Sequence, residues 1–185
     1  MNKKFIVYFG LIILLAISCV TANLPSKLIP KQNKLVNENG MIIGSISFET
    51  KDVKICNRYN FYFENLKGYA WENKKNNFIQ IIPSQTIHMD FKPDFFDEDR
   101  AVYYFKIEKP AGRYRFYAMK TMREFYDRVE YQTKDIDIPI TIEKGKVKYF
   151  GELTVNRYND IRASTKAARD LPKLKKMFPN LEIEN

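Results

Sequence analysis

One run of alternating isoleucines constrains this chain more than any other feature. Between Ile136 and Ile142 every second residue is isoleucine, and the residues between them are aspartate, proline and threonine. Side chains of an extended strand point alternately to opposite faces. The pattern therefore predicts a strand over Ile136–Glu143 with one buried face. Pro139 lacks a backbone N–H, which favours an edge strand or a bulge at this position.

A hairpin is predicted to follow from this strand. Lys146–Val155 is a second strand candidate, and a two-residue turn at Lys144-Gly145 would join the two. In that register Ile142 lies opposite Val147, so the apolar faces of the two strands coincide. A slip of one residue would turn one whole face toward water, because side chains alternate with a period of two.

An earlier hairpin is predicted from Ala101–Glu108 and Arg113–Lys120. The intervening Lys109-Pro110-Ala111-Gly112 has proline at the second position and glycine at the fourth, which suits a type I turn. Pairing across this turn sets Phe105 opposite Phe116, so the apolar faces again agree.

The rest of the domain is predicted to be largely strand. The other strand candidates, which alternate or are rich in aromatic residues, are Met41–Phe48, Tyr59–Phe63, Phe78–Ile82 and Thr86–Phe91. Between the two hairpins, Met122–Tyr131 fits either a strand or a helical turn.

Ala163–Phe178 is the best helix candidate, because its large apolar residues fall at helical spacing. Ser164 or Thr165 is the expected N-cap. Pro172 interrupts a continuous helix unless a second one begins at Asp170, since proline is tolerated in a first turn.

Residues 1–22 are predicted to be an export signal. Lys3-Lys4 precedes the apolar run Phe5–Ile17, which is shorter than the roughly twenty residues that a spanning helix needs. Leu15-Ala16-Ile17-Ser18-Cys19 resembles the bacterial lipobox, in which the cysteine is lipidated and becomes N-terminal. Cys19 is therefore the candidate lipidation site. Ordinary cleavage after Ala22 and an uncleaved signal anchor are the alternatives.

Residues 23–39 are predicted to be a flexible tether, and residues 40–185 a single β-sandwich domain with a C-terminal helix. The net charge is +9. The basic residues are scattered and mixed with acids, so the chain lacks the clustered footprint of a nucleic-acid-binding protein, and no such partner is expected. Attraction to an anionic membrane or cell-wall surface is the expected use of the charge.

Two segments around the predicted turns carry a family resemblance. Pro110-Ala111-Gly112-Arg113-Tyr114-Arg115-Phe116 and Gly145-Lys146-Val147-Lys148-Tyr149-Phe150-Gly151-Glu152 resemble segments of a group of uncharacterised bacterial lipoproteins with a transthyretin-like or carboxypeptidase-regulatory-like β-sandwich. The resemblance covers Gly40–Leu181, and Asp170–Leu181 looks like the short closing helix of that group. It implies turn chemistry and packing rather than activity, and it brings no catalytic residues. The expected fold is all-β: a transthyretin-like or Ig-like antiparallel β-sandwich with a short C-terminal helix.

Few residues could support nucleophilic or metal chemistry. His88 is the single histidine, so a catalytic triad or a Cys56–His88 dyad would have to use it. Asp90 lies two residues away on the same outward face, where a solvated surface is the expected role. A multi-histidine zinc site is excluded. Cys56 is expected to be a small, buried apolar residue, and no cofactor or metal is predicted.

Two loops carry the alternative functions. Asp97, Glu98 and Asp99 are the candidate acids of a cell-wall or glycan hydrolase, which needs two carboxylates facing each other across a cleft. The same loop lacks the spacing of an EF-hand calcium site. Trp71 is the residue that a carbohydrate-binding module would use, although a loop aromatic that covers a sheet edge is the competing interpretation.

The sequence favours a lipid-anchored β-sandwich protein of the cell envelope that acts as a protein-binding or structural module, without catalytic activity. Its expected partners are a membrane, through Cys19, and an envelope protein. The bacterial outer membrane is the expected location, with the periplasm or secretion as alternatives. The arginines expected to form a basic stripe on the outer sheet face, which would oppose edge-to-edge aggregation, are Arg113, Arg115, Arg123 and Arg128.

Overall fold

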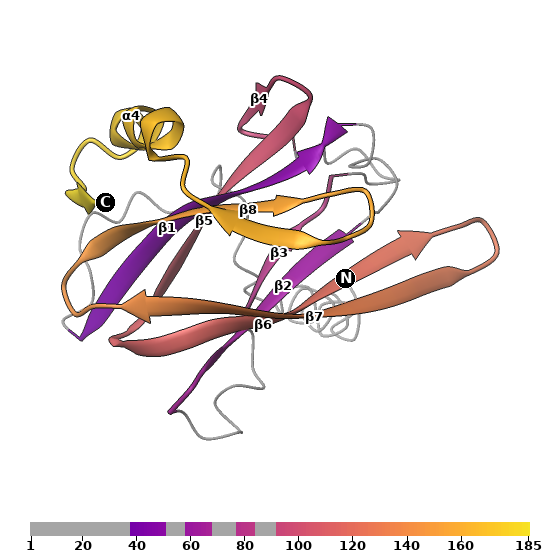
Figure 1. The fold of residues 1–185 in the computed structure, drawn as a ribbon, viewed down its shortest axis with the longest axis horizontal. Helices are drawn as coiled ribbons and strands as arrows, with labels where there is room; N and C mark the ends of the chain where they lie inside the picture. Colours follow the sequence, from indigo (N-terminus) through magenta and orange to yellow (C-terminus); the bar gives the residue numbers. More distant parts are fainter. Residues whose placement is uncertain (1–37, 51–57, 68–76, 84–91) are drawn as a thin grey trace, which may run out of the picture.

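The structure, a computed structural model, describes residues 38–50, 58–67, 77–83 and 92–185. The strands, in chain order, are β1 (Asn39–Glu49), β2 (Arg58–Asn65), β3 (Phe78–Ile81), β4 (Phe95–Asp97), β5 (Arg100–Pro110), β6 (Gly112–Glu124), β7 (Val129–Ile142), β8 (Val147–Val155), β9 (Ile161–Ser164) and β10 (Ile183–Glu184). Helix α4 (Ala167–Met177) lies between β9 and β10 (Figure 1). The predicted all-β class with a short C-terminal helix is confirmed.

The described strands form two sheets. The larger sheet has the order β10-β8-β1-β5-β4, with β9 also paired to β8, and the smaller has the order β3-β2-β6-β7. The smaller sheet is antiparallel throughout. In the larger sheet β8 runs parallel to both β1 and β10, so the expectation of a purely antiparallel sandwich is wrong for this layer.

Both predicted hairpin pairings are wrong, although the strands themselves are correct. β5 pairs with β1 and β4, whereas β6 pairs with β2 and β7, so the chain passes from one sheet to the other between β5 and β6. β7 and β8 likewise belong to different sheets. Phe105 and Phe116 do meet, with ring centroids 6.1 Å apart, but across the interior of the sandwich. Two strands can match in their apolar sides either because they pair within one sheet or because they face each other across two packed sheets.

The longest hairpin of the described residues joins β6 to β7 through Phe125–Arg128, where the backbone N–H of Phe125 donates to the carbonyl of Arg128 at 2.8 Å. Met122–Tyr131 is therefore strand, turn and strand, with no helical turn. Pro139 lies on β7, an edge strand, as predicted. Within Ile136–Ile142 the last two isoleucines are buried and the first two are half-buried against the same core.

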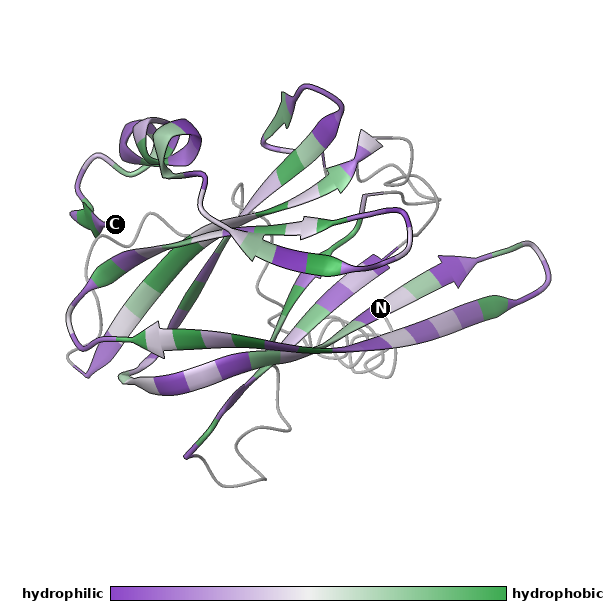
Figure 2. Cartoon of the chain, in the orientation of Figure 1, coloured by the Kyte–Doolittle hydropathy of each residue, from purple (hydrophilic) through white to green (hydrophobic). Residues whose placement is uncertain are grey.

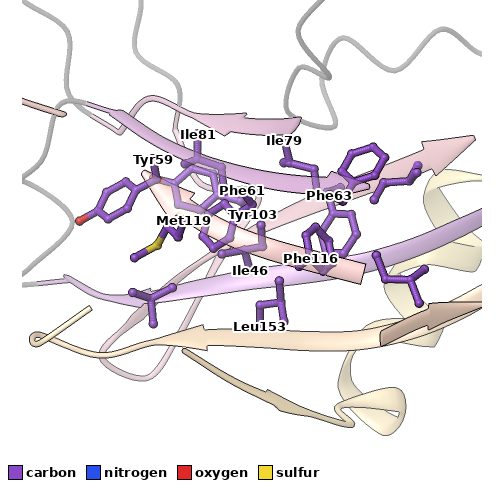
Figure 3. Packing of buried hydrophobic residues seen from close by; sticks show 14 of the residues in the cluster. Ile46, Tyr59, Phe61, Phe63, Ile79, Ile81, Tyr103, Phe116, Met119 and Leu153 are labelled. Atoms are coloured by element: carbon purple, nitrogen blue, oxygen red, sulfur yellow. The ribbon is translucent and has the colours of Figure 1, made fainter. Parts of the chain in front are cut away.

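The main core lies between the two sheets. Both layers contribute to it: the labelled side chains in Figure 3 come from β1, β5 and β8 on one side and from β2, β3 and β6 on the other. Aromatic rings dominate the packing, and the rings of Phe48 and Tyr59 are 4.4 Å apart between centroids. Figure 2 shows how apolar and polar residues alternate along the strands that cover this core.

A second core lies on the opposite face of the larger sheet, beneath α4. It is built from β1, β5, β8, α4 and β10. β1 is therefore buried on both faces, because it is central in its sheet and is covered by the main core on one side and by this second core on the other. Leu174 of α4 is fully buried here, as its helical spacing predicted.

The start of α4 differs from the prediction. Ser164 belongs to β9, and the helix begins at Ala167 after Lys166, whose side chain makes no capping hydrogen bond. Pro172 lies inside one continuous helix, so no second helix begins at Asp170. Tertiary contacts of Asp170 and Leu174 hold this helix on the sheet and outweigh the lost backbone hydrogen bond.

Several sequence predictions fall outside the described residues. They concern the export signal, Cys19, Cys56, Trp71, His88, Asp90 and the strand Thr86–Phe91. Within the described ranges, no helix combines the length and the apolar character needed to cross a membrane.

Candidate functional site

A buried ionic cluster lies between α4 and the outer face of the larger sheet. The Arg169 guanidinium donates from Nε to Asp170 Oδ1 at 2.7 Å, from Nη1 to Asp97 Oδ2 at 2.8 Å and from Nη2 to Glu152 Oε1 at 2.7 Å. Its side chain is 14% exposed, that of Glu152 1% and that of Asp170 0%. Burial by itself lowers the pKa of Arg169, but the hydrogen bonds to the three carboxylates outweigh burial and raise the pKa above its ordinary range.

Asp170 is the centre of this cluster. Besides Arg169, it accepts hydrogen bonds from Ser45 Oγ at 2.8 Å, from the Tyr149 hydroxyl at 2.7 Å and from the Tyr104 hydroxyl at 3.4 Å. Burial, followed by contact with Asp170, raises the pKa of both tyrosines, so both phenols stay protonated and donate. Its hydrogen-bond donors shield the Asp170 carboxylate from solvent, and the cluster holds α4 against the sheet.

The sequence contained one signal for this cluster. Asp170 lies four residues before Leu174 and therefore on the same helix face, which is the face predicted to be buried. A carboxylate on a buried helix face needs a cation or several donors. The identity of those partners, on β1, β4, β5 and β8, depends on the tertiary fold.

The predicted catalytic acids do not converge in the structure. Asp97 forms an ion pair with Arg169, whose hydrogen bond lowers the pKa of Asp97 below its ordinary value. Glu98 and Asp99 are exposed on the turn between β4 and β5. Among the described residues, no three histidine, cysteine or acidic side chains are grouped as a metal site. The geometry of this loop does not favour paired-carboxylate hydrolysis.

The predicted basic stripe follows β6 and the turn after it, and its charges are offset by acids. Arg115 binds Glu64 at 2.7 Å and Asp137 at 3.4 Å. Arg128 binds Glu130 at 2.9 Å. Two of the four arginines of the stripe are therefore engaged in surface ion pairs.

The two most exposed large hydrophobic side chains of the described residues, Tyr126 and Tyr131, lie on a projection that we call the arm, Thr121–Asp135. The arm is the outer part of the β6–β7 hairpin, and it extends past the neighbouring strand β2, whose first residue Arg58 pairs with Met122 (Figure 1). All seven residues of Val129–Asp135 are exposed. The core therefore does not require this length of strand.

The tip of the arm is aromatic. Tyr126 is fully exposed, Tyr131 is 74% exposed, and Phe125 and Val129 are also exposed. The Arg128 guanidinium lies 4.8 Å from the centre of the Phe125 ring, a cation–π contact. A hollow of about 290 Å³ on the arm is lined by Thr121, Arg123, Glu130, Tyr131 and Gln132. The tip therefore exposes several large apolar side chains to solvent.

The base of the arm is held by the turn that joins β8 to β9. Asn159 Nδ2 donates to Gln132 Oε1 at 2.9 Å, and Lys134 Nζ forms an ion pair with Asp160 at 2.8 Å. These contacts orient the arm, and the tip lies beyond them.

The start of β1 lies at the opposite end of the domain from the tip. Lys144 Nζ forms an ion pair with Glu38 at 2.7 Å, and the backbone N–H of Gly145 donates to the carbonyl of Asn39 at 2.9 Å. The domain therefore begins beside the β7–β8 turn (Figure 1). β7 has 14 residues and runs from the tip to this end, a length of about 45 Å at roughly 3.3 Å per residue.

The comparisons with known proteins add no family. No protein-family model and no curated protein sequence matches the chain. A solved structure of a leucine-rich repeat protein from Bacteroides thetaiotaomicron is similar with a TM-score of 0.35 and 11% sequence identity. The alignment covers 76% of this chain and 16% of that chain. A likeness of this degree carries no argument about function.

Proposed function

We propose that this chain is a lipid-anchored protein of the bacterial cell envelope that binds another envelope protein through the tip of the arm. The observation that carries the proposal is the exposed aromatic tip, in which Tyr126 and Tyr131 project and Arg128 lies against the ring of Phe125. Tyrosine and arginine are enriched among the residues that dominate protein–protein binding energy.

The position of the tip supports a protein partner. If Cys19 carries the lipid, residues 20–38 connect the membrane to β1 and span at most about 70 Å when extended. The tether enters beside Gly145, and the tip lies at the far end of β7. The attachment point of the tether and the tip therefore lie at opposite ends of the domain, which leaves the tip accessible to a protein partner.

The charge of the arm also favours a protein over an anionic bilayer. Its three basic residues are outnumbered by its four acidic residues; they are Arg123, Arg128, Lys134, Glu124, Asp127, Glu130 and Asp135. Segments that bind anionic membranes are strongly basic.

Site-specific photo-crosslinking tests the binding proposal. A photoreactive phenylalanine analogue replaces Tyr126 in cells that export the full chain, and the control position is Phe96, which is 65% exposed on β4. The expected result is one discrete protein adduct from position 126 and none from position 96. Adding Val129→Ser should remove the adduct without lowering the melting temperature, because Val129 is exposed. Equal labelling from both positions, or none from position 126, would refute the proposal.

The anchor has its own test. Cells that express the chain are fed a labelled fatty acid, and the parent is compared with Cys19→Ala. The label should enter the parent alone. Processing that is unchanged by the substitution, with no label in either protein, would remove the lipid anchor while leaving binding through the arm intact.

A further inference from the structure

The outer edge of β7 is a pairing surface. β7 is bonded to β6 on one side, and no other strand of the described residues pairs with it. The hydrogen bond from Phe125 N–H to the Arg128 carbonyl closes the turn. Along an antiparallel pair, residues whose N–H and C=O groups point toward the partner strand alternate with residues whose groups point away from it. Counted from this turn, the N–H and C=O groups of Tyr131 and Thr133 point away from β6, toward the open edge.

This edge has a limited length. β7 bulges where its register against β6 shifts between Phe116 and Ala118, and Pro139 follows with no N–H to donate. The stretch suited to pairing is therefore Val129–Asp135, the seven consecutive exposed residues of the arm.

The sequence of the edge is self-complementary. Val129-Glu130-Tyr131-Gln132-Thr133-Lys134-Asp135 has Glu130 and Lys134 at equal distances on either side of Gln132. When two antiparallel copies of this strand are centred on Gln132, each Glu130 lies opposite the other copy's Lys134. Opposite charges directly across two strands are stabilising, and the two-fold symmetry makes the contact twice.

We propose that two copies of this chain pair through the outer edges of β7, antiparallel and centred on Gln132. The backbone alternation agrees with this register, because the outward-pointing Tyr131 of one copy then lies opposite the outward-pointing Thr133 of the other. A centre at Tyr131 would oppose Arg128 with Lys134, two like charges. A centre at Thr133 would leave the strand without an opposite-charge pair.

Existing ion pairs do not prevent this contact. Glu130 binds Arg128 and Lys134 binds Asp160, and all four side chains are 44–59% exposed. Ion pairs at such exposure contribute little and exchange readily. The paired segment includes Val129 and Tyr131 of the tip, whereas Tyr126 lies in the turn beyond it and stays accessible when two copies pair. The joined ribbon carries one tip at each end.

The expected dimer is weak in solution. A seven-residue strand pair is smaller than the roughly 1,200–2,000 Å² of a standard stable interface. Tethering to one surface raises the effective concentration of the copies and so favours pairing.

Charge reversal tests the register. Glu130→Lys and Lys134→Glu should each weaken dimerisation of the full chain about tenfold in sedimentation velocity across a concentration series, because each places like charges opposite one another. The double variant Glu130→Lys/Lys134→Glu should regain most of the parent affinity. It restores the contacts between copies but not those with Arg128 and Asp160 inside each copy, so recovery reports pairing between copies. A double variant as weak as the single ones would overturn the proposal.

A disulfide tests the centre of symmetry. In a full-chain background of Cys19→Ala and Cys56→Ala, Gln132→Cys sets two cysteines opposite each other at a non-hydrogen-bonded pair, about 4.5 Å between Cα atoms, which suits a disulfide. The control is Tyr126→Cys, which is fully exposed but has no counterpart opposite it. Mild oxidation should give severalfold more covalent dimer from position 132. Equal yields of covalent dimer from positions 132 and 126 would overturn the register. The photo-crosslink from position 126 to an envelope protein tests the proposed function separately and does not depend on this result.

Discussion

Replacement of Arg169 with methionine tests the buried ionic cluster most directly. Methionine keeps an unbranched stem but removes the cation, so Asp170 and Glu152, which are 0% and 1% exposed, lose their shared partner. Breaking a buried ion pair from one side costs about 3–5 kcal/mol. Ser45 and Tyr149 still donate to Asp170, so we expect the lower end of this range, about 3 kcal/mol.

The loss can be measured as a change in melting temperature. For a domain of this size, 1 kcal/mol corresponds to about 2–4 °C, so Arg169→Met should lower the melting temperature of the full chain by about 6–12 °C at neutral pH. Circular dichroism in the far ultraviolet follows the transition. The matched control is Arg115→Met, the same substitution at a more exposed guanidinium that binds Glu64 and Asp137, and it should change little.

A second variant separates charge from packing. Arg169→Met/Glu152→Gln removes one of the uncompensated carboxylates and should recover part of the lost stability, because the two positions are in direct contact. The reasoning is refuted if Arg169→Met melts no lower than Arg115→Met. A double variant less stable than Arg169→Met alone would show that lost packing, not unpaired charge, causes the effect.

Three further predictions follow from the structure. Tyr149→Phe removes a donor to Asp170 at 2.7 Å and should lower the free energy of unfolding by about 1.5–3 kcal/mol in urea titrations. Gly151→Ala should destabilise by more than about 1 kcal/mol in the same assay, because φ is +111° and the new Cβ would lie 2.5 Å from the Ser164 carbonyl oxygen. The hydrogen bond from the Arg169 guanidinium holds the pKa of Asp97 below its ordinary value of 3.8. The stability that this ion pair gives is complete above that pH and lost as the pH falls through the lowered pKa, so Asp97→Asn should show a shallower loss of stability than the parent as the pH falls below about 4.

The strands were largely predictable because their signal is local. The alternation in Ile136–Ile142 and the aromatic run Tyr59–Phe63 both lie in observed strands, and the predicted isoleucine face of Ile136–Ile142 lies toward the core. The short strand Ile161–Ser164 was not predicted as a strand, because four residues carry too little pattern to separate it from the segment before a helix.

The candidate surface was less predictable than the fold. Half of the residues of Met122–Tyr131 are apolar or aromatic, but they do not alternate with a strict period of two, so strand and helical turn were both open. Its extension past β2 makes it an arm, and that depends on where β2 begins, at Arg58. Tyr126 is exposed because the arm projects from the domain. The residue type alone does not show whether a tyrosine is exposed or buried.

The sequence by itself indicated most of the extended segments and the apolar side of the strands that alternate, because a period of two is visible in neighbouring residues. Only the tertiary structure decided which strands pair. Phe105 and Phe116 match equally well as cross-strand neighbours or as facing residues of two sheets, and the structure places them across the core. The choice depends on competing partners far away in the chain: β1 pairs with β5, and β2 pairs with β6. The same long-range pairing brings Arg169 to Glu152 and leaves the arm projecting from the domain.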